Sequence, residues 1–487
     1  MVRIAIVGAG ISGLSCAWYA RREFPDAHLD VYEASDRVGG VIQTLDTPHP
    51  IECGADNFAT LMPDAWQLVR EMGLESEFIT PNRDYRIARV VRNGRLHAIP
   101  NGFSLMQPTR MGAILATPIL SWSGRLRVLR EYWIPPRRDT GDESVESFAV
   151  RRLGRECFER LVEPIVGGIF TAKAETLSMQ AAMPQFIKME QEHGGLIRAA
   201  WAKRSQPSSD QQSARQASGA RYDQFVAPKL GMTWWLNKLA EPLGHRLHLN
   251  TAVTQLRRIE ALHSDQREDA SSAGRWRLTL RDAQGQSRVP EDYDVVILAL
   301  PAYASAELLP AEQTALASEL RSIPYASSAI AVLDVKRSEI RPDAFCFGSI
   351  APTIERRDCL AISLSSEKYS GRCPPDRVLM RVFMGGAVRP ELLERSDAEL
   401  MGMARREVQA LFGPATSPAY EHMVHWERAM PQYLVGHVDR VRTIRGLASA
   451  VPGLELIGNA YDGVGIPQCV RGAKQAVLRQ AAQYLKS

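Results

Sequence analysis

Three glycines and one glutamate near the start of the chain stand out by their types and spacing. Gly8, Gly10 and Gly13 follow the apolar run 4–7, where a buried strand would turn into a helix. The first glycine allows a tight turn, the second lets backbone amides approach a pyrophosphate, and the third lets helix and strand pack closely. Glu33 ends a second apolar strand about twenty residues later, where a carboxylate binds a ribose hydroxyl. The pattern predicts a dinucleotide site with contacts at Gly8, Ala9, Gly10, Ile11, Ser12, Gly13, Glu33 and Ala34.

The residues after Glu33 narrow the choice of dinucleotide. Arg37, Gly39, Gly40 and Thr44 resemble the Arg-x-Gly-Gly segment of flavoproteins in the amine oxidase and porphyrinogen oxidase superfamily. The resemblance implies that a second stretch of backbone, which includes Val41, covers FAD. Simple NAD-dependent dehydrogenases lack this extension, so FAD is the expected cofactor.

Length and composition limit the class of protein. A chain of 487 residues is expected to form two or three folding units. The 59 Lys and Arg against 55 Asp and Glu give a net charge of only +4, which indicates no nucleic-acid partner. The seven cysteines are scattered without paired spacing, as in a reduced cytosolic protein. His422 and His425 lie close together without a completed ligand set, so no metal site is predicted.

The sequence predicts a cytoplasmic protein and leaves contact with a membrane face open. A secretory signal is not expected because the first nucleotide-binding strand begins at Val2, and residues 111–122 are too short to span a bilayer. Residues 105–133 combine apolar side chains and two tryptophans with Arg110, Arg125, Arg127 and Arg130. This composition suits a surface that rests among lipid headgroups, and it suits the core of a helical subdomain nearly as well.

The order of predicted elements indicates an α/β and α+β protein with a discontinuous Rossmann-like domain. The apolar run 294–301 is typical of a strand that returns to a parallel sheet. Alternating segments around Asn93-Gly94 predict a hairpin that begins a mixed second sheet. We expect an FAD-binding domain from residues 1–82, 228–302 and 440–487, a substrate-binding domain from 83–100 and 303–439, a helical subdomain at 101–204 that is a candidate for membrane contact, and a flexible polar loop at 205–222.

The end of the chain repeats the strand, glycine loop and helix pattern of its beginning. An apolar strand at 454–457 is followed by a glycine-containing loop and by a helix that Pro467 opens at its favoured first turn. The positive end of this helix can face the pyrimidine edge of a flavin, where the reduced form carries negative charge.

Several segments, in order and nearly from end to end, resemble the protoporphyrinogen and coproporphyrinogen oxidase family of haem biosynthesis. They are DESV (142–145) with Phe148, RRLG (151–154), EPIVGGIF (163–170), PQF (184–186), WERAMPQY (426–433) with Gly436-His437, and GNAYDGVGIP (458–467). The resemblance implies further FAD contacts at Gly54, Ala55, Asp56, Asn57, Val253, Trp426, Asn459, Val464, Gly465 and Ile466.

The same resemblance implies the reaction. A bridging methylene of a porphyrinogen gives hydride to the flavin in three successive steps, with oxygen as the expected acceptor, and the protein mainly positions the methylene. No protein side chain is therefore expected to act as a catalytic acid or base. The anionic propionates require an apolar pocket with cations at its rim, for which we nominate Lys173 and Arg428.

Four readings stay open. The substrate is protoporphyrinogen IX in the first reading and coproporphyrinogen III in the second, and a flavin amine oxidase or desaturase is a more distant reading. A non-catalytic FAD-binding scaffold belongs to another class altogether. The sequence does not decide whether the chain forms a homodimer.

Overall fold

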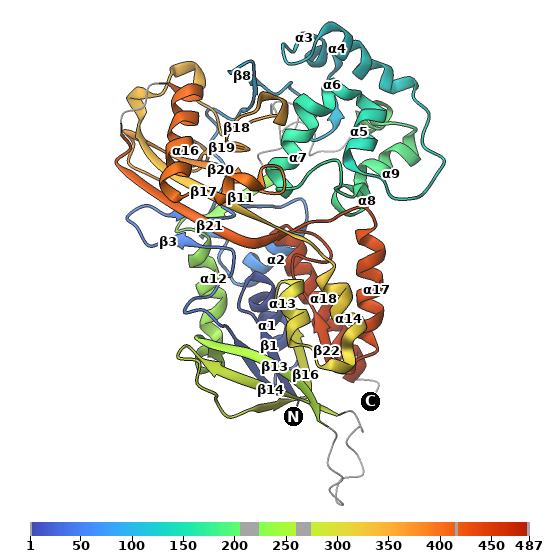
Figure 1. Ribbon diagram of the computed structural model, residues 1–487, viewed down its shortest axis with the longest axis vertical. Helices are drawn as coiled ribbons and strands as arrows, with labels where there is room; N and C mark the ends of the chain where they lie inside the picture. Colours follow the sequence, from blue (N-terminus) through green and yellow to red (C-terminus); the bar gives the residue numbers. More distant parts are fainter. Residues whose placement is uncertain (1, 205–223, 260–273, 414–416, 485–487) are drawn as a thin grey trace, which may run out of the picture.

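The computed structural model describes residues 2–204, 224–259, 274–413 and 417–484, so the predicted loop at 205–222 lies outside the described residues. Figure 1 shows a lower unit that contains both ends of the chain and two upper units side by side. One upper unit is built around a mixed sheet and the other is helical.

The lower unit is built on a parallel sheet of five strands. Their spatial order is β12 (Leu247–His248), β2 (His28–Tyr32), β1 (Arg3–Val7), β16 (Val295–Leu298) and β22 (Leu454–Leu456). In the register of the central strands, Ile6 of β1 lies between Val31 of β2 and Ile297 of β16. Segments from the start, middle and end of the chain therefore share one sheet.

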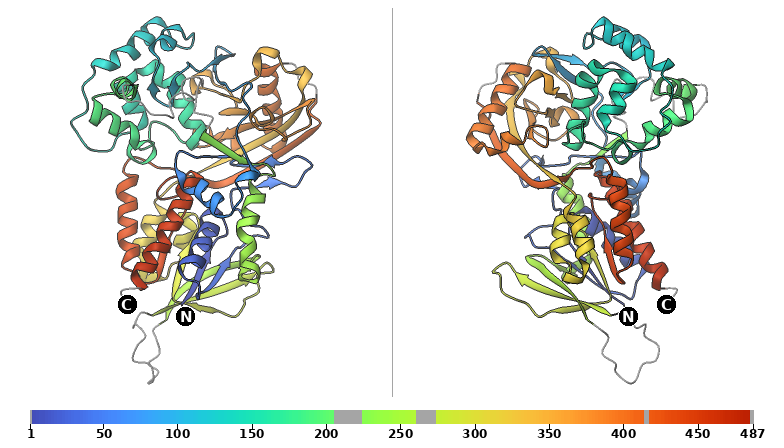
Figure 2. Two further views of the ribbon diagram at one scale, coloured as in Figure 1. Left: turned by 180° about the vertical axis from the view of Figure 1, so that it is seen from behind. Right: turned by 45° about the vertical axis from the view of Figure 1, so that its right-hand side comes forward.

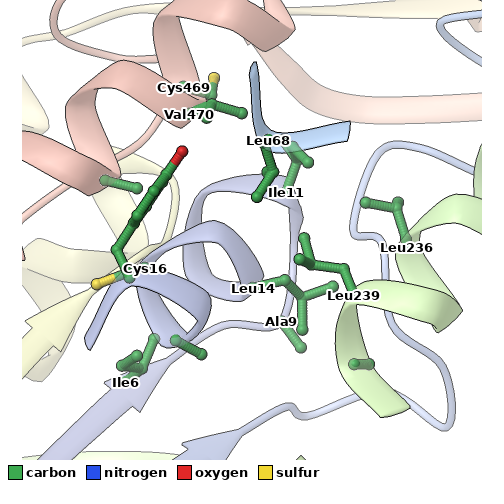
Figure 3. Close-up of a cluster of buried hydrophobic side chains, with 14 of the residues drawn as sticks. Ile6, Ala9, Ile11, Leu14, Cys16, Leu68, Leu236, Leu239, Cys469 and Val470 are labelled. Atoms are coloured by element: carbon green, nitrogen blue, oxygen red, sulfur yellow. The ribbon is translucent and has the colours of Figure 1, made fainter. Parts of the chain in front are cut away.

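Alternate residues of β1 point to opposite faces of this sheet. Ile4 and Ile6 pack with α1 (Ile11–Glu23), α2 (Pro63–Glu71), α12 (Met232–Ala240) and α18 (Ile466–Tyr484). Figure 3 shows Leu14 of α1, Leu239 of α12 and Val470 of α18 in one cluster of buried side chains. This core brings the first and last long helices of the chain together.

Ala5 and Val7 face the other side. There they pack with the meander β13 (Thr251–Ile259), β14 (Arg275–Asp282) and β15 (Glu291–Tyr293), and with α13 (Ala302–Leu308), α14 (Thr314–Arg321) and α17 (His437–Ser449). The predicted boundary at residue 303 assigns α13 and α14 to the second domain, and the structure differs. Leu308, Leu316 and Leu320 bury their side chains against the parallel sheet, which holds both helices on the first domain.

The second unit is a mixed sheet of seven strands. Their order is β21 (Tyr420–Pro431), β17 (Tyr325–Lys336), β20 (Arg377–Gly385), β19 (Ala361–Leu364), β18 (Gly348–Ile350), β7 (Ala88–Arg92) and β8 (Arg95–Ala98). Asn93 and Gly94 both have positive φ and form the predicted turn between β7 and β8. One face is covered by α16 (Asp397–Phe412), and the other packs on Ile51 and Cys53 of the first domain.

The third unit is helical. It comprises α3 (Met111–Ala116), α4 (Trp122–Leu129), the 3-10 turn η2 (Arg130–Trp133), α5 (Val145–Leu153), α6 (Arg155–Cys157), the π-helical turn η3 (Phe158–Val162), α7 (Glu163–Phe170), α8 (Met179–Ala182), α9 (Pro184–His193) and α10 (Leu196–Arg204). Figure 2 shows this unit beside the mixed sheet from two further directions. None of the helices in the described ranges combines the length and the apolar character needed to cross a membrane.

Short strands connect the units. β3 (Thr44–Leu45) pairs with β4 (Ile51–Glu52), and β11 (Phe225–Pro228) lies between β5 (Phe58–Ala59) and β6 (Phe78–Ile79). The segment 51–59 therefore runs from the mixed sheet, on which Ile51 and Cys53 pack, to the core of the parallel-sheet domain, where Phe58 is buried.

Candidate active site

The junction between β1 and α1 has the geometry that the glycine spacing predicts. Gly8 has φ of +103°, and a Cβ atom there would lie 2.6 Å from the carbonyl oxygen of Ala299. A Cβ on Gly13 would lie 1.8 Å from the carbonyl oxygen of Gly8. These two positions therefore exclude any side chain, one through backbone conformation and one through helix–strand contact.

Gly10 differs from its two neighbours in the motif. Its φ of −72° and ψ of 179° are open to any residue, and the nearest protein atom to a Cβ there is 4.0 Å away. Gly10 is also the N-cap of α1 and provides no side-chain cap for the helix amides. Open space in front of an uncapped helix N-terminus is what a pyrophosphate requires, so these residues fit an FAD.

Glu33 lies directly beside this turn. Its carboxylate accepts hydrogen bonds from the backbone N–H of Ala9 at 2.8 Å and from the N–H and hydroxyl of Ser35. The backbone of Glu33 pairs with His248 and Thr251. These bonds bring the half-buried Val253 of β13 to the same end of the site, where an adenine contact is predicted.

The second stretch of backbone also reaches the turn. Gly39 donates to the carbonyl of Ala9 at 2.9 Å, and Gly10 and Gly39 form a parallel bridge. Ala34, Gly40 and Val41 are exposed, with Val41 at 44%, and are therefore accessible to a bound nucleotide. The guanidinium of Arg37 donates to the carbonyls of Val38, Gly40 and Ile42. Arg37 therefore stabilises the conformation of this loop, which is a role that the spacing of the Arg-x-Gly-Gly segment alone does not reveal.

The turn at residues 52–57 is held from the mixed sheet. Trp426 of β21 donates its indole N–H to the carbonyl of Cys53 at 2.7 Å. Arg381 of β20 donates to the carbonyls of Glu52 and Gly54. Ala55 is exposed, while Gly54 and Asn57 are half-buried. Trp426 is therefore a direct link between the second domain and the turn predicted to touch the flavin.

Asp56 has a more specific environment than its predicted cofactor contact implies. Its carboxylate binds Arg381 at 2.7 Å and Lys368 at 3.1 Å and also accepts from the amide of Asn57. Burial alone would raise the pKa of Asp56, but Lys368 and Arg381 lower it to about 2. The side chain is thus an ionised anchor between domains, and Asp56 can offer a cofactor only its backbone.

The junction between β22 and α18 lies at the same edge of the parallel sheet as the Gly8 turn, because β1 and β22 flank β16 and run parallel to it. Helices α1 and α18 share one core, in which Ile11, Ile466 and Cys469 are all buried. Asn459 and Gly463 are tied to Tyr433, whose hydroxyl donates to the carbonyl of Asn459 and accepts from the N–H of Gly463 at 3.0 Å. The predicted contacts at Val464 and Gly465 follow directly in this loop, and the one at Ile466 lies at the first residue of α18.

A cavity of about 760 Å³ opens between the helical unit and the mixed-sheet unit. Trp426 forms part of its wall, together with the ends of β17 and β21. Both nominated cations line it: Lys173 is exposed just after α7, and Arg428 lies over the ring of Tyr303 at 3.7 Å. The lining also contains Glu394 and Glu427, so the otherwise largely apolar cavity carries charged groups of both signs.

Several residues of this region carry no signal in the sequence. Arg381, Lys368 and Tyr433 act through side chains that reach across domain boundaries, and their partners are more than 25 residues away. In the part of the chain that the structure describes, no group of three or more His, Cys, Asp or Glu side chains could hold a metal ion. The site is thus formed by glycine turns, helix ends and a cavity.

Comparisons with known proteins identify the class. The model of the flavin-containing amine oxidoreductase family matches residues 11–479, and the chain belongs to this family. It is a flavoprotein oxidoreductase, and the prediction of FAD as its cofactor is confirmed.

More specific relatives lie within this class. The chain is 29% identical to the coproporphyrinogen III oxidase of Bacillus subtilis (strain 168), over 99% of this chain and 98% of that one. It is 30% identical to the Propionibacterium freudenreichii protein of the same name, over 97% and 89% of the two chains. It is 28% identical to the protoporphyrinogen oxidase of Bos taurus over 98% of both. The predicted resemblance to the porphyrinogen oxidases is confirmed.

Solved structures agree with this placement. A provisionally assigned protoporphyrinogen oxidase from Exiguobacterium sp. 255-15 superposes with a TM-score of 0.81 at 27% identity, over 99% of both chains. Cyclohexylamine oxidase from Brevibacterium oxydans IH-35A gives a TM-score of 0.68 at 17% identity over 99% of both chains, which shows a common fold.

Proposed function

We propose that this protein oxidises a porphyrinogen to the corresponding porphyrin as a step of haem biosynthesis, with protoporphyrinogen IX as the first candidate substrate. FAD supplies the redox chemistry when bound, because its isoalloxazine accepts the hydride that a bridging methylene gives up. Complete oxidation of the macrocycle removes six electrons, so three equivalents of oxygen become three of peroxide if oxygen is the acceptor.

The observation that carries the proposal is the position of Trp426. This side chain lines the cavity on one side and binds the carbonyl of Cys53, next to the Gly54 turn, on the other. A ligand in the cavity would therefore lie one side chain away from the turn expected to face the flavin. A volume of about 760 Å³ is within the range of small-molecule and cofactor sites.

The residues of the cavity would bind and orient the substrate. Propionates are carboxylates, which form strong charge-assisted hydrogen bonds with Lys and Arg. Lys173 and Arg428 come from different units and can bind two propionates at separate points of the rim. Stacking on Tyr303 restricts the guanidinium of Arg428, so less freedom is lost when it binds a carboxylate.

The test is turnover in air by purified protein loaded with FAD. We expect porphyrin fluorescence to rise with three peroxides formed per porphyrin. Lys173→Met and Arg428→Met should raise KM several-fold with a smaller effect on kcat, because the lost contacts hold the periphery of the substrate. Lys188→Met, at an exposed position of α9, is the matched control. Failure to oxidise any porphyrinogen would contradict the proposal.

Coproporphyrinogen III is a second candidate. It carries four propionates and no vinyl groups, and Lys173 and Arg428 of the cavity lining can pair with two of these propionates. The 30% identity to a relative named coproporphyrinogen III oxidase supports the same reading. The ratio of kcat/KM for the two porphyrinogens, measured on one preparation, distinguishes them.

We also propose that the helical unit rests on an anionic membrane surface. Trp122 and Trp133 are 68% and 70% exposed, and the helical unit also exposes Leu115 of α3, Leu126 of α4 and Trp201 of α10. Trp133 and Trp201 both contact the ring of Tyr132, so this apolar surface is continuous between η2 and α10. Arg125 lies over Trp122 at 4.5 Å. Exposed tryptophans beside arginines suit the headgroup layer.

Binding to vesicles tests this surface. The wild-type protein should sediment with vesicles of phosphatidylglycerol and less with neutral ones, and Trp122→Ser with Trp133→Ser should remove most of the binding. Leu478→Ser, at an exposed position of α18, is the control. Equal sedimentation of all variants would contradict the surface. We propose accordingly that the protein lies in the cytoplasm, on the membrane face. We also propose a homodimer, which analytical ultracentrifugation of the protein without vesicles would test.

A further inference from the structure

Five charged side chains are buried together behind the turn at residues 52–57. Two are anions, Glu52 and Asp56, and three are cations, Lys368, Arg372 and Arg381. The side chains of Glu52, Arg372 and Arg381 are at most 3% exposed, and those of Asp56 and Lys368 are 12% and 19% exposed. The cluster therefore contains one more positive than negative group.

The cluster is fixed to the backbone of the turn. Arg381 donates to the carbonyls of Glu52 and Gly54, at 3.2 and 2.7 Å, as well as to Asp56. The ammonium of Lys368 lies 3.1 and 3.2 Å from the two carboxylate oxygens of Asp56. Because two cations share one carboxylate, part of their charge is not neutralised locally.

The remaining members stabilise this arrangement. Glu52 lies 3.7 Å from Arg372 and accepts from Thr44 and from the N–H of Met232. The ring of Tyr369 lies 5.5 Å from the ammonium of Lys368 and 5.9 Å from the guanidinium of Arg372. An aromatic face between two cations reduces the cost of burying them.

We propose that Lys368 and Arg381 are positioning residues that raise the reduction potential of the flavin. Their unbalanced charge lies directly behind the Gly54 turn, and a buried charge acts over a longer range than an exposed one. A reduced flavin carries negative charge, so a nearby excess cation stabilises the reduced form more than the oxidised form. The inference rests on the proposed contact between this turn and FAD.

The test is the two-electron midpoint potential of FAD-loaded protein. In Lys368→Met, two cations face two anions, and the reduced form should lose about tenfold in relative stability, which lowers the potential by about 30 mV. Asp56→Asn removes an anion and should raise it. Lys368→Arg keeps the charge and should restore the wild-type value. Lys238→Met breaks an exposed ion pair with Glu241 and should leave the potential unchanged.

The measured potentials test this inference independently of the proposed porphyrinogen oxidation. A purely structural role would lower FAD loading and thermal stability in both charge variants without opposite shifts in potential. Unchanged potentials in Lys368→Met and Asp56→Asn, with FAD bound, would overturn the inference even if the protein oxidises porphyrinogens. Opposite shifts in a protein that oxidises no porphyrinogen would support the inference and contradict the proposed function.

Discussion

Gly10 and Gly13 belong to one glycine motif but have different roles. A Cβ on Gly13 would meet the carbonyl oxygen of Gly8 at 1.8 Å, whereas a Cβ on Gly10 would meet nothing nearer than 4.0 Å. Gly13 is thus required by the packing of α1 on β1. Gly10 is required only by whatever fills the space in front of the helix.

This difference gives the first prediction. Gly10→Val should leave the apoprotein folded, because the backbone of Gly10 suits any residue, and should weaken FAD binding at least about 100-fold, which corresponds to about 3 kcal/mol. Titration of apoprotein with FAD measures it. Gly13→Ala is the contrasting variant, and it should lower the melting temperature of the apoprotein itself. A yellow, fully loaded Gly10→Val protein would refute the assignment.

His437 gives a prediction for acid stability. Its ring is buried and stacks on Tyr433 at 4.0 Å, and burial, with Arg440 nearby, lowers the pKa of His437 to about 4. An unfolded histidine titrates near 6.5, so the unfolded chain binds this proton first as the pH falls. The contribution is fully present above about pH 6.5 and is lost between pH 6.5 and 4, to a total of about 3 kcal/mol.

Denaturant unfolding at several pH values checks this. His437→Phe keeps a ring on Tyr433 and should reduce the loss of unfolding free energy between pH 6.5 and 4. An identical pH dependence in the variant and the wild type would show that other groups control acid unfolding.

At the scale of elements, the C-terminal loop depends on a side chain that precedes α17. The hydroxyl of Tyr433 binds both Asn459 and Gly463, and its backbone carbonyl accepts from Ser178. Tyr433→Phe would leave a carbonyl and an amide without their partner, which costs about 1–3 kcal/mol. We expect faster hydrogen exchange in residues 459–466 and weaker FAD binding. Tyr420→Phe, on β21, is the control, and equal exchange in both variants would contradict this role.

The predicted elements were most accurate where local sequence determines them. The two strand-to-helix junctions follow from glycines, a proline and apolar runs, and these signals are local. The role of Asp56, and the domain to which α13 and α14 belong, are instead determined by contacts between segments that are distant in the sequence. The partners of Asp56 are Lys368 and Arg381, more than 300 residues away, and no spacing rule connects them. The sequence therefore identified the turn and could not identify what holds it.

At the scale of the whole molecule, four separate stretches converge on the predicted FAD site. They lie around Gly8, Gly40, Gly54 and Val464, and the third is held by side chains from the mixed sheet. Binding of one FAD should therefore stabilise distant parts of the chain together.

This convergence predicts the effect of cofactor on stability. At a free FAD concentration 100 times Kd, the folded protein should gain about 2.7 kcal/mol. Hydrogen exchange should slow in both the 8–13 and the 458–466 segments of the wild type and in neither segment of Gly10→Val. Protection of only one segment would contradict a shared site.

The central claim is that the flavin held between the two ends of the chain takes electrons from a porphyrinogen in the adjoining cavity. Mixing FAD-loaded protein with a porphyrinogen in the absence of oxygen tests it most directly. We predict that the visible absorbance of the oxidised flavin disappears at a rate that saturates with porphyrinogen and returns when air is admitted. A flavin that stays oxidised with both protoporphyrinogen IX and coproporphyrinogen III would contradict the account.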